Sequence, residues 1–211
     1  MLAPGPIRDE HLRRGLRLEA LSIGWNVVEA VIAIGAGWLA GSIALVGFGL
    51  DSVIETIAGV ALYRRLGAEL GGVDEETAES HERRALAIVG GTFFLLAAYI
   101  LFEAGTTLWL REPPQESVLG MALASVSLVV MPLLAIMKKR TGDALGSRAL
   151  VADANETFVC VYLSATLLLG LGLNALVGWW WADPVAALLM VPFVLREGRE
   201  AWEESRETDA T

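Results

Sequence analysis

Two carboxylates lie one helical turn apart inside an apolar run, in the segment GFGLDSVIETIAG at residues 47–59. At the i, i+4 spacing, Asp51 and Glu55 project from the same face of a helix. An ionisable side chain at the centre of a bilayer costs about 2.5–3.5 kcal/mol on insertion scales. Two adjacent carboxylates also repel each other unless a cation or a proton lies between them. The pair therefore indicates a cation-binding site, and a structural hydrogen-bonded pair is the alternative.

A second copy of this pattern occurs 105 residues later in the chain. The segment SIALVGFGLDSVIE at 42–55 aligns with SRALVADANETFVC at 147–160. Asp51 then corresponds to Glu156, and Glu55 corresponds to Cys160. Three carboxylates and one thiol match the coordination number of a tetrahedral divalent-cation site. We predict that these four residues are metal ligands, although a lone cysteine is often a small buried apolar residue.

Long apolar segments must position these side chains. The chain has 211 residues, of which 55% are hydrophobic, and its mean hydropathy is +0.54, which favours a membrane protein. About 20 apolar residues cross the hydrocarbon layer of a bilayer. The sequence predicts six spans, of which the last is short: 20–40, 43–63, 85–110, 118–137, 149–175 and 183–196. We expect an all-α membrane protein with a polar N-terminal segment at 1–19 that is no signal peptide, a transmembrane domain at 20–197 and a short tail at 198–211.

Basic residues set the expected orientation. Of the 16 Lys and Arg residues, only Arg111 falls on the face opposite the N-terminus; the others lie in the N-terminal segment, around the polar loop at 74–84, in the loop after residue 137 and near the C-terminus. By the positive-inside rule, both termini are cytoplasmic. The formal net charge of −9 is spread over loops and tails, which argues against nucleic acid as a partner.

In this topology the second and fifth spans run in opposite directions, so the two copies are inverted. Many transporters place a substrate site near the midplane between inverted repeats. At 1.5 Å per residue, Asp51 lies about 13 Å and Glu55 about 20 Å from the start of the first copy. Glu156 and Cys160 lie at the same distances from the opposite face. All four ligands are therefore expected in one slab around the bilayer centre.

These motifs resemble the cation diffusion facilitator family, six-helix exporters of zinc and related divalent metals. That family has Ser-x-Ala-Leu in its second and fifth helices, followed by a ligand, a Ser and a second ligand four residues after the first. Here the first copy has Ser42, Ala44, Leu45, Asp51, Ser52 and Glu55, and the second has Ser147, Ala149, Leu150, Glu156, Thr157 and Cys160. Asp183-Pro184 at the start of the sixth span is also similar. The resemblance covers about residues 20–197 and implies an inverted-repeat cation efflux domain.

Departures from the family pattern bear on the metal. Relatives commonly have a His among the four ligands and an Asp at the position of Cys160, so metal identity does not carry over. The tail after residue 197 is shorter than the family's cytoplasmic C-terminal domain. We therefore expect no metal sensing by such a domain, and a homodimer would have to form through the transmembrane helices.

Three further polar residues lie within the predicted spans. Asp153 shares a helix stripe with Glu156 and Cys160, and three roles stay open for it: metal ligand, acid at the mouth of the pathway or helix cap. Asn26 and Glu29 share one face of the first span. They are candidates for a proton relay or for support of the ligands, and a polar contact between helices is the alternative.

The sequence thus predicts a secondary transporter in the inner or plasma membrane that exports a divalent cation in exchange for protons. A thiolate favours zinc-like ions such as Zn²⁺, Cd²⁺ or Co²⁺, whereas oxygen ligands also suit Mn²⁺ and Fe²⁺. The metal ion is substrate, and we expect no permanently bound cofactor. The sequence has no Walker-type loop, no His within a span and no evident nucleophile–base pair, so we expect neither an ATPase nor another enzyme. Two alternatives stay open: a metal-binding membrane protein that does not transport, and a proton-coupled carrier of an organic cation.

Overall fold

A computed structural model of the chain describes residues 5–71, 75–111 and 114–207, with side chains described for 5–71, 90–111 and 114–203. Within these ranges the chain forms six α-helices and no β-strand. The helices are α1 (Pro6–Ala40), α2 (Ile43–Gly71), α3 (Glu75–Leu110), α4 (Val118–Leu145), α5 (Arg148–Val177) and α6 (Ala182–Glu207). The predicted all-α class is confirmed, but residues 75–84 are helical and do not form the predicted loop, because α3 begins at Glu75.

The turn between α1 and α2 is built from two glycines and a serine. Gly41 adopts the left-handed conformation with φ of 66°, which a glycine tolerates without a Cβ penalty. A Cβ on Gly37 would lie 2.8 Å from the backbone nitrogen of Val46, so the two helices are in direct backbone contact there. Ser42 caps α2, because its Oγ accepts a hydrogen bond of 3.1 Å from the backbone nitrogen of Leu45.

The turn between α4 and α5 repeats this construction 105 residues later. Gly146 has a φ of 68°, and a Cβ on Gly142 would lie 3.1 Å from the backbone nitrogen of Val151. Ser147 Oγ caps α5 by accepting a hydrogen bond of 3.4 Å from the Leu150 nitrogen. The structural repeat therefore begins earlier than residues 42 and 147, since GWLAGSIALV at 37–46 matches GDALGSRALV at 142–151.

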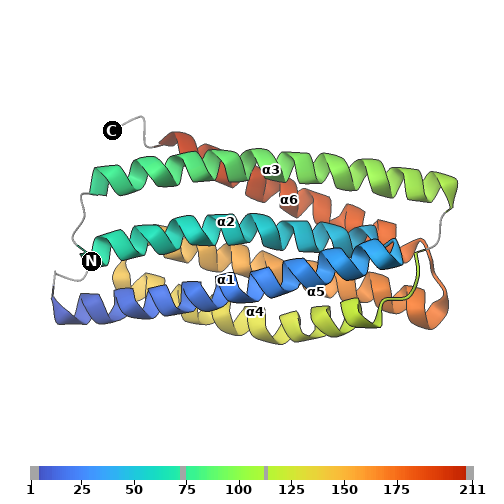
Figure 1. Ribbon diagram of the computed structural model, residues 1–211, viewed down its shortest axis with the longest axis horizontal. Coiled ribbons are helices and arrows are strands. Elements are labelled where there is room, and N and C mark those ends of the chain that lie inside the picture. Colours follow the sequence, from blue (N-terminus) through green and yellow to red (C-terminus); the bar gives the residue numbers. More distant parts are fainter. Residues whose placement is uncertain (1–4, 72–74, 112–113, 208–211) are drawn as a thin grey trace.

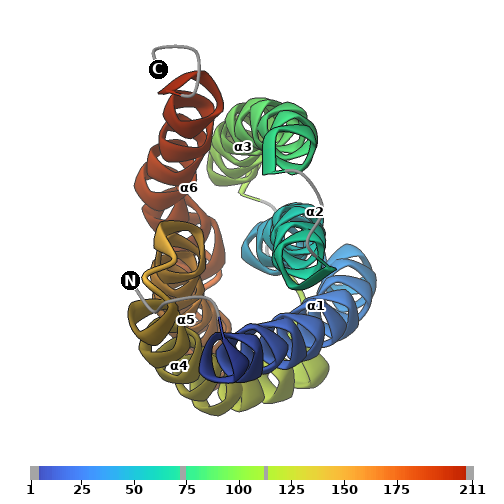
Figure 2. The same cartoon turned by 90° about the vertical axis from the view of Figure 1, so that its left-hand side faces the viewer.

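The two hairpins turn at opposite ends of the bundle (Figure 1). This is the inverted arrangement that the sequence repeat predicts. The beginning of α1 and the end of α6 lie at the same end, which the α4–α5 turn also occupies. Seen from that end, the helices follow one another around the bundle in the order α1, α2, α3, α6, α5, α4, with α4 returning to α1 (Figure 2). Contacts between α2 and α5 cross the interior of this ring and bring the two copies of the repeat together.

Five helices are long and apolar enough to cross a membrane, namely α1, α2, α4, α5 and the Gly90–Leu110 part of α3. Their outward faces expose large apolar side chains, such as Val31 at 70% and Leu176 at 88%. A bilayer explains such exposure, because lipid is an apolar solvent. In the described part of α6 the apolar stretch ends at Leu195, where charged residues begin. The sixth span therefore stays a prediction.

Asp183 joins the start of α6 to the start of α2. Its carboxylate accepts hydrogen bonds from the Ser42 hydroxyl and from the backbone nitrogen of Ile43, the latter at 3.0 Å. The Asp183 side chain is fully buried. A carboxylate at a helix N-terminus satisfies backbone donors that have no partner within the helix. This contact therefore fixes α6 against α2 at the end where the α1–α2 hairpin turns.

Candidate metal site

Three of the four predicted ligands meet in the interior of the bundle. Asp51, Glu55 and Cys160 each offer one ligand atom, and these three atoms lie within 4.8 Å of one another. Cys160 Sγ lies 2.9 Å from Glu55 Oε1 and 3.9 Å from Asp51 Oδ2. Asp51 and Cys160 are buried at 1% and 0% exposure, while Glu55 is partly exposed. The side chains of two residues on successive turns of α2 and of one residue on α5 therefore come together in the interior.

The donor spacing suits a small divalent cation. In a tetrahedral site with metal–ligand bonds of 2.0–2.3 Å, neighbouring donor atoms lie about 3.5 Å apart. The separations of Cys160 Sγ from the two carboxylates, 2.9 and 3.9 Å, lie on either side of this value. The Cys160 thiol donates a hydrogen bond to the Glu55 carboxylate. Since a thiolate is the metal ligand, binding would release this proton.

Glu156 lies one turn before Cys160 on α5 but is not part of the group of three. Its side chain is partly exposed, and its carboxylate interacts electrostatically with Glu55. The predicted set of four is thus a compact group of three with Glu156 beside it, on the side of the α4–α5 turn. Its role as a ligand stays a prediction.

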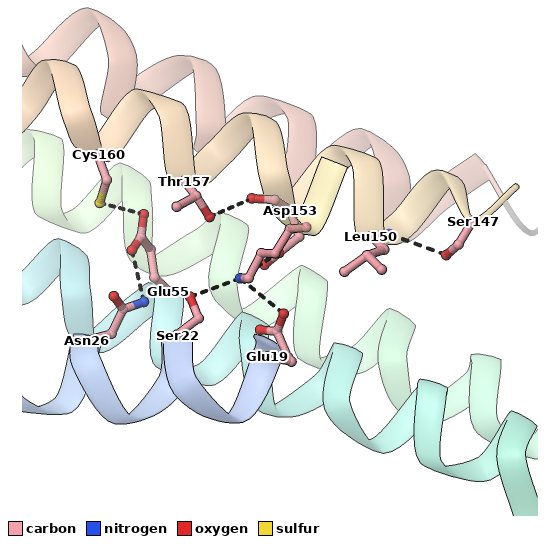
Figure 3. A network of polar contacts seen from close by, with 10 residues as sticks. Glu19, Ser22, Asn26, Glu55, Ser147, Leu150, Asp153, Thr157 and Cys160 are labelled. Atoms are coloured by element: carbon pink, nitrogen blue, oxygen red, sulfur yellow. Dashed lines mark hydrogen bonds and ion pairs between the residues drawn. The ribbon is translucent and has the colours of Figure 1, made fainter. Parts of the chain in front are cut away.

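Asp153 lies one turn closer to that end, in a different polar cluster (Figure 3). Its Oδ2 lies 2.7 Å from Lys138 Nζ on α4, which also lies 3.0 Å from Glu19 Oε2 on α1. Lys138 donates a further hydrogen bond of 2.9 Å to Ser22 Oγ. Lys138 and Glu19 are each 1% exposed, so this is a buried ion-pair cluster that joins α1, α4 and α5. Asp153 therefore faces an ammonium group here and is not among the three grouped donors.

The sequence did not predict the buried position of Lys138. The predicted fourth span ends at residue 137 and is followed by a loop, but α4 continues to Leu145 and buries the Lys138 side chain. The sequence does show a pattern for the polar residues of α1. Glu19, Ser22, Asn26 and Glu29 follow one another at three- and four-residue steps, which places them on one face of α1.

Asn26 and Glu29 contact the α2 ligand segment directly. Asn26 Nδ2 donates a hydrogen bond of 3.0 Å to Glu55 Oε2, the oxygen that does not face Cys160 (Figure 3). The fully buried Glu29 accepts hydrogen bonds from the hydroxyls of Ser52, at 3.4 Å, and Ser127. Asn26 thus orients a predicted ligand, and Glu29 places a further carboxylate next to the Asp51–Ser52 step. Their part in proton transfer stays a prediction.

Comparison with known proteins places this geometry in a family. The model of the cation efflux transmembrane domain matches residues 81–207, which is more than half of the chain. The chain is 27% identical over 170 residues to the cation-efflux pump FieF of Shewanella oneidensis, covering 79% of this chain and 56% of that protein. It is 27% identical over 186 residues to the cadmium, cobalt and zinc/H(+)-K(+) antiporter of Bacillus subtilis, covering 86% of this chain and 58% of the relative.

A third relative is the manganese efflux system protein MneS of Bacillus subtilis, 24% identical over 201 residues, covering 94% of this chain and 69% of that protein. The chain spans little more than half the length of the first two relatives. With its membrane-crossing helices, it is a multi-pass integral membrane protein. The family match extends over α3, α4, α5 and α6, and thus includes the second copy of the repeat. This chain therefore belongs to the cation efflux, or cation diffusion facilitator, family.

Proposed function

We propose that this protein is a secondary transporter that exports a divalent metal cation from the cytoplasm in exchange for protons. One observation carries the proposal: Asp51, Glu55 and Cys160, from two inverted copies of one motif, place three ligand atoms within 4.8 Å of one another inside the bundle. Membership of the cation efflux family supports it, because the family moves metal ions as substrates. Inverted repeats that meet at a central site are the arrangement from which alternating access is built.

The exchange of a metal ion for protons is possible because the same groups can bind either one. The Asp51 and Glu55 carboxylates and the Cys160 thiol can hold either a cation or protons. A divalent ion that binds to the deprotonated groups neutralises their charge, and its departure leaves groups that protons can neutralise instead. Glu156 lies beside the group and supplies a fourth ligand once the side chains close on the ion. Asn26, which holds one oxygen of Glu55, sets the direction of the other.

The donor set favours zinc-like ions. A sulfur ligand selects Zn²⁺, Cd²⁺ or Co²⁺ over Mg²⁺ and Ca²⁺, whereas carboxylates alone also accept Mn²⁺ and Fe²⁺. The names of two relatives support this range, because one is an antiporter for cadmium, cobalt and zinc and the other a manganese efflux protein. We propose zinc as the probe of first choice.

The orientation completes the proposal. We place the common end of α1, α6 and the α4–α5 turn in the cytoplasm, because Lys and Arg residues concentrate there. The transmembrane domain then covers residues 20–197, with α6 as the sixth span, in the plasma membrane. A homodimer through the transmembrane helices is compatible with the apolar outer faces.

The test is zinc flux in proteoliposomes, with a pH-sensitive dye on the opposite side of the membrane. Wild-type protein is expected to move Zn²⁺ and protons in opposite directions, whereas Asp51→Asn and Glu55→Gln are expected to fall to the leak of protein-free vesicles. Glu103→Gln on α3 is the control, because it removes an acid within a span that is not one of the grouped donors. Zinc binding without flux would refute transport and favour a non-transporting binding protein. Flux that an organic cation drives and zinc does not inhibit would refute the choice of substrate.

A further inference from the structure

Glu197 on α6 is an acid that the site described so far does not use. Its side chain is only 3% exposed, and neither carboxylate oxygen has a hydrogen-bond partner among the residues that the structure describes. Buried carboxylates in proteins are normally paired or hydrogen-bonded, because burial without a partner removes their hydrogen bonds to water and puts no others in their place. A group that violates this rule in a family of cation carriers is a candidate ligand for a cation.

The face of α6 that carries Glu197 packs against the ligand helices. Val194 and Ala201, one turn before and one turn after Glu197, are buried in the same apolar cluster as Ile54 of α2 and Leu163 of α5. Ile54 immediately precedes Glu55 in the chain, and Leu163 lies one turn after Cys160. Glu197 therefore lies on a buried face of α6, a helix that contacts both α2 and α5.

The electrostatic neighbours of Glu197 agree with this placement. Its carboxylate interacts with those of Asp51, Glu55 and Glu156, which are predicted ligands from both copies of the repeat, and with that of the exposed Glu200 on its own helix. Together with Cys160, Glu197 and the three predicted carboxylate ligands would present four carboxylates and one thiol from α2, α5 and α6. A divalent cation would satisfy this set, and Glu197 is the member that comes from outside the repeat.

The other acids of this part of α6 behave differently. Glu200 and Glu203 are 52% and 54% exposed, and each accepts a hydrogen bond from an arginine four residues earlier, at 2.6 and 2.7 Å. These arginines are themselves exposed at 69% and 74%. These side chains extend into solvent, whereas the Glu197 side chain is buried.

We propose that Glu197 is an additional carboxylate ligand of the transported divalent cation, contributed by α6 to the site formed by α2 and α5. The inference rests on the proposed function, since it assigns a residue to the same cation. It makes α6 part of the binding site, so that the ion contacts three helices. It also explains why the apolar stripe of α6 contains an acid.

The test measures zinc affinity of the purified full chain in detergent by equilibrium dialysis with radioactive zinc. Glu197→Gln keeps the shape of the side chain and removes its charge, and it is expected to weaken Zn²⁺ binding by about 10- to 100-fold. Glu203→Gln makes the same change at an exposed carboxylate of α6 and is expected to leave affinity unchanged. Unchanged affinity in Glu197→Gln would overturn the proposal, as would an equal loss in both variants, which would indicate a general effect of charge.

A second readout uses Cys160, the single thiol of the chain. Zinc is expected to protect it from alkylation by N-ethylmaleimide, and in Glu197→Gln the zinc concentration needed for half protection should rise by the same factor as the affinity falls. Thermal unfolding without metal checks the fold, and the amide variant should be at least as stable as wild type. If Glu197→Gln does not fold, Glu197→Asp carries the test: a fall in zinc affinity supports the proposal, and wild-type affinity overturns it.

Asp51→Asn separates this inference from the proposed function. If Asp51→Asn loses zinc binding while Glu197→Gln retains it, only the role of Glu197 is wrong. If Asp51→Asn retains wild-type binding, the proposed metal site itself fails. A change in proton movement at unchanged zinc affinity in Glu197→Gln would also overturn the ligand role, because it would make Glu197 a proton carrier only.

Discussion

Replacing Lys138 by methionine should destabilise the folded protein far more than a typical surface substitution. The Lys138 ammonium lies 3.0 Å from Glu19 Oε2 and 2.7 Å from Asp153 Oδ2, and it donates a hydrogen bond to Ser22. Methionine keeps most of the aliphatic volume, so the substitution removes the charge without opening a large cavity. Two carboxylates then lose their shared cation inside the bundle.

The size of the effect follows from the burial of the two acids. Removing one partner of a buried ion pair costs about 3–5 kcal/mol, because the other charge is left without compensation. Glu19 is 1% exposed and bears the full penalty, whereas the Asp153 side chain is 16% exposed and can regain part of its hydration. We therefore expect a loss of about 3–5 kcal/mol in the free energy of unfolding and not twice that value.

The measurement is unfolding of the purified protein in mixed micelles with increasing sodium dodecyl sulfate, followed by circular dichroism. Lys139→Met is the matched control, since Lys139 is the next residue on α4 and is exposed. It should change stability by less than about 1 kcal/mol. The triple variant Glu19→Gln, Lys138→Met, Asp153→Asn removes all three charges and should recover most of the loss. Equal stability of Lys138→Met and Lys139→Met, or no recovery in the triple variant, would refute the ion-pair argument.

Two further predictions concern the contacts that hold the hairpins, both measured by the same unfolding assay. Asp183→Asn turns an amide towards backbone donors at the start of α2 and should lower the free energy of unfolding by about 1–2 kcal/mol. Glu116→Gln is the control, because it changes an exposed acid before α4 and should not alter stability measurably. Equal effects of the two variants would contradict the capping role of Asp183. Gly142→Ala should destabilise the fold, because its Cβ would lie 2.8 Å from a Val151 methyl carbon and 3.1 Å from its nitrogen. A Cβ on Gly172 would have no atom within 4 Å, so Gly172→Ala should stabilise α5 by up to about 1 kcal/mol through the higher helix propensity of alanine. A loss of stability in Gly172→Ala would contradict this reasoning.

Several features of the fold could be predicted from local patterns. Apolar length placed the α1–α2 turn correctly, between residues 40 and 43, where Gly41 ends α1 in a conformation that other residues avoid. The recurrence of Ser-x-Ala-Leu with acids behind it predicted an inverted pair of helices. Convergence of Glu55 and Cys160 followed from equal distances along two antiparallel helices, which depend only on the helical rise.

The helix ends at the polar side were harder to predict. Hydropathy ended the fourth span before Lys138 and treated residues 74–84 as a loop, but α4 and α3 extend beyond the apolar segments. Helical hydrogen bonding does not require apolar side chains, so a helix can continue past the bilayer or bury a charge that finds partners. Hydropathy shows neither how far a helix continues past its apolar segment nor which residues pair with a buried charge.

The sequence by itself determined the class of protein, the two copies of the ligand motif and the positions of their polar residues along each helix, because composition, spacing and helical rise are properties of single segments. Only the tertiary structure decided which side chains meet. Asp153 and Glu156 lie on neighbouring turns of α5, yet one contacts Lys138 and the other lies beside the three grouped donors. Glu197 is buried on a third helix, α6, whereas its neighbours Arg196 and Glu200 are exposed. These choices depend on how each helix is rotated and tilted against its neighbours, which is set by the packing of whole helix faces and is absent from any one segment.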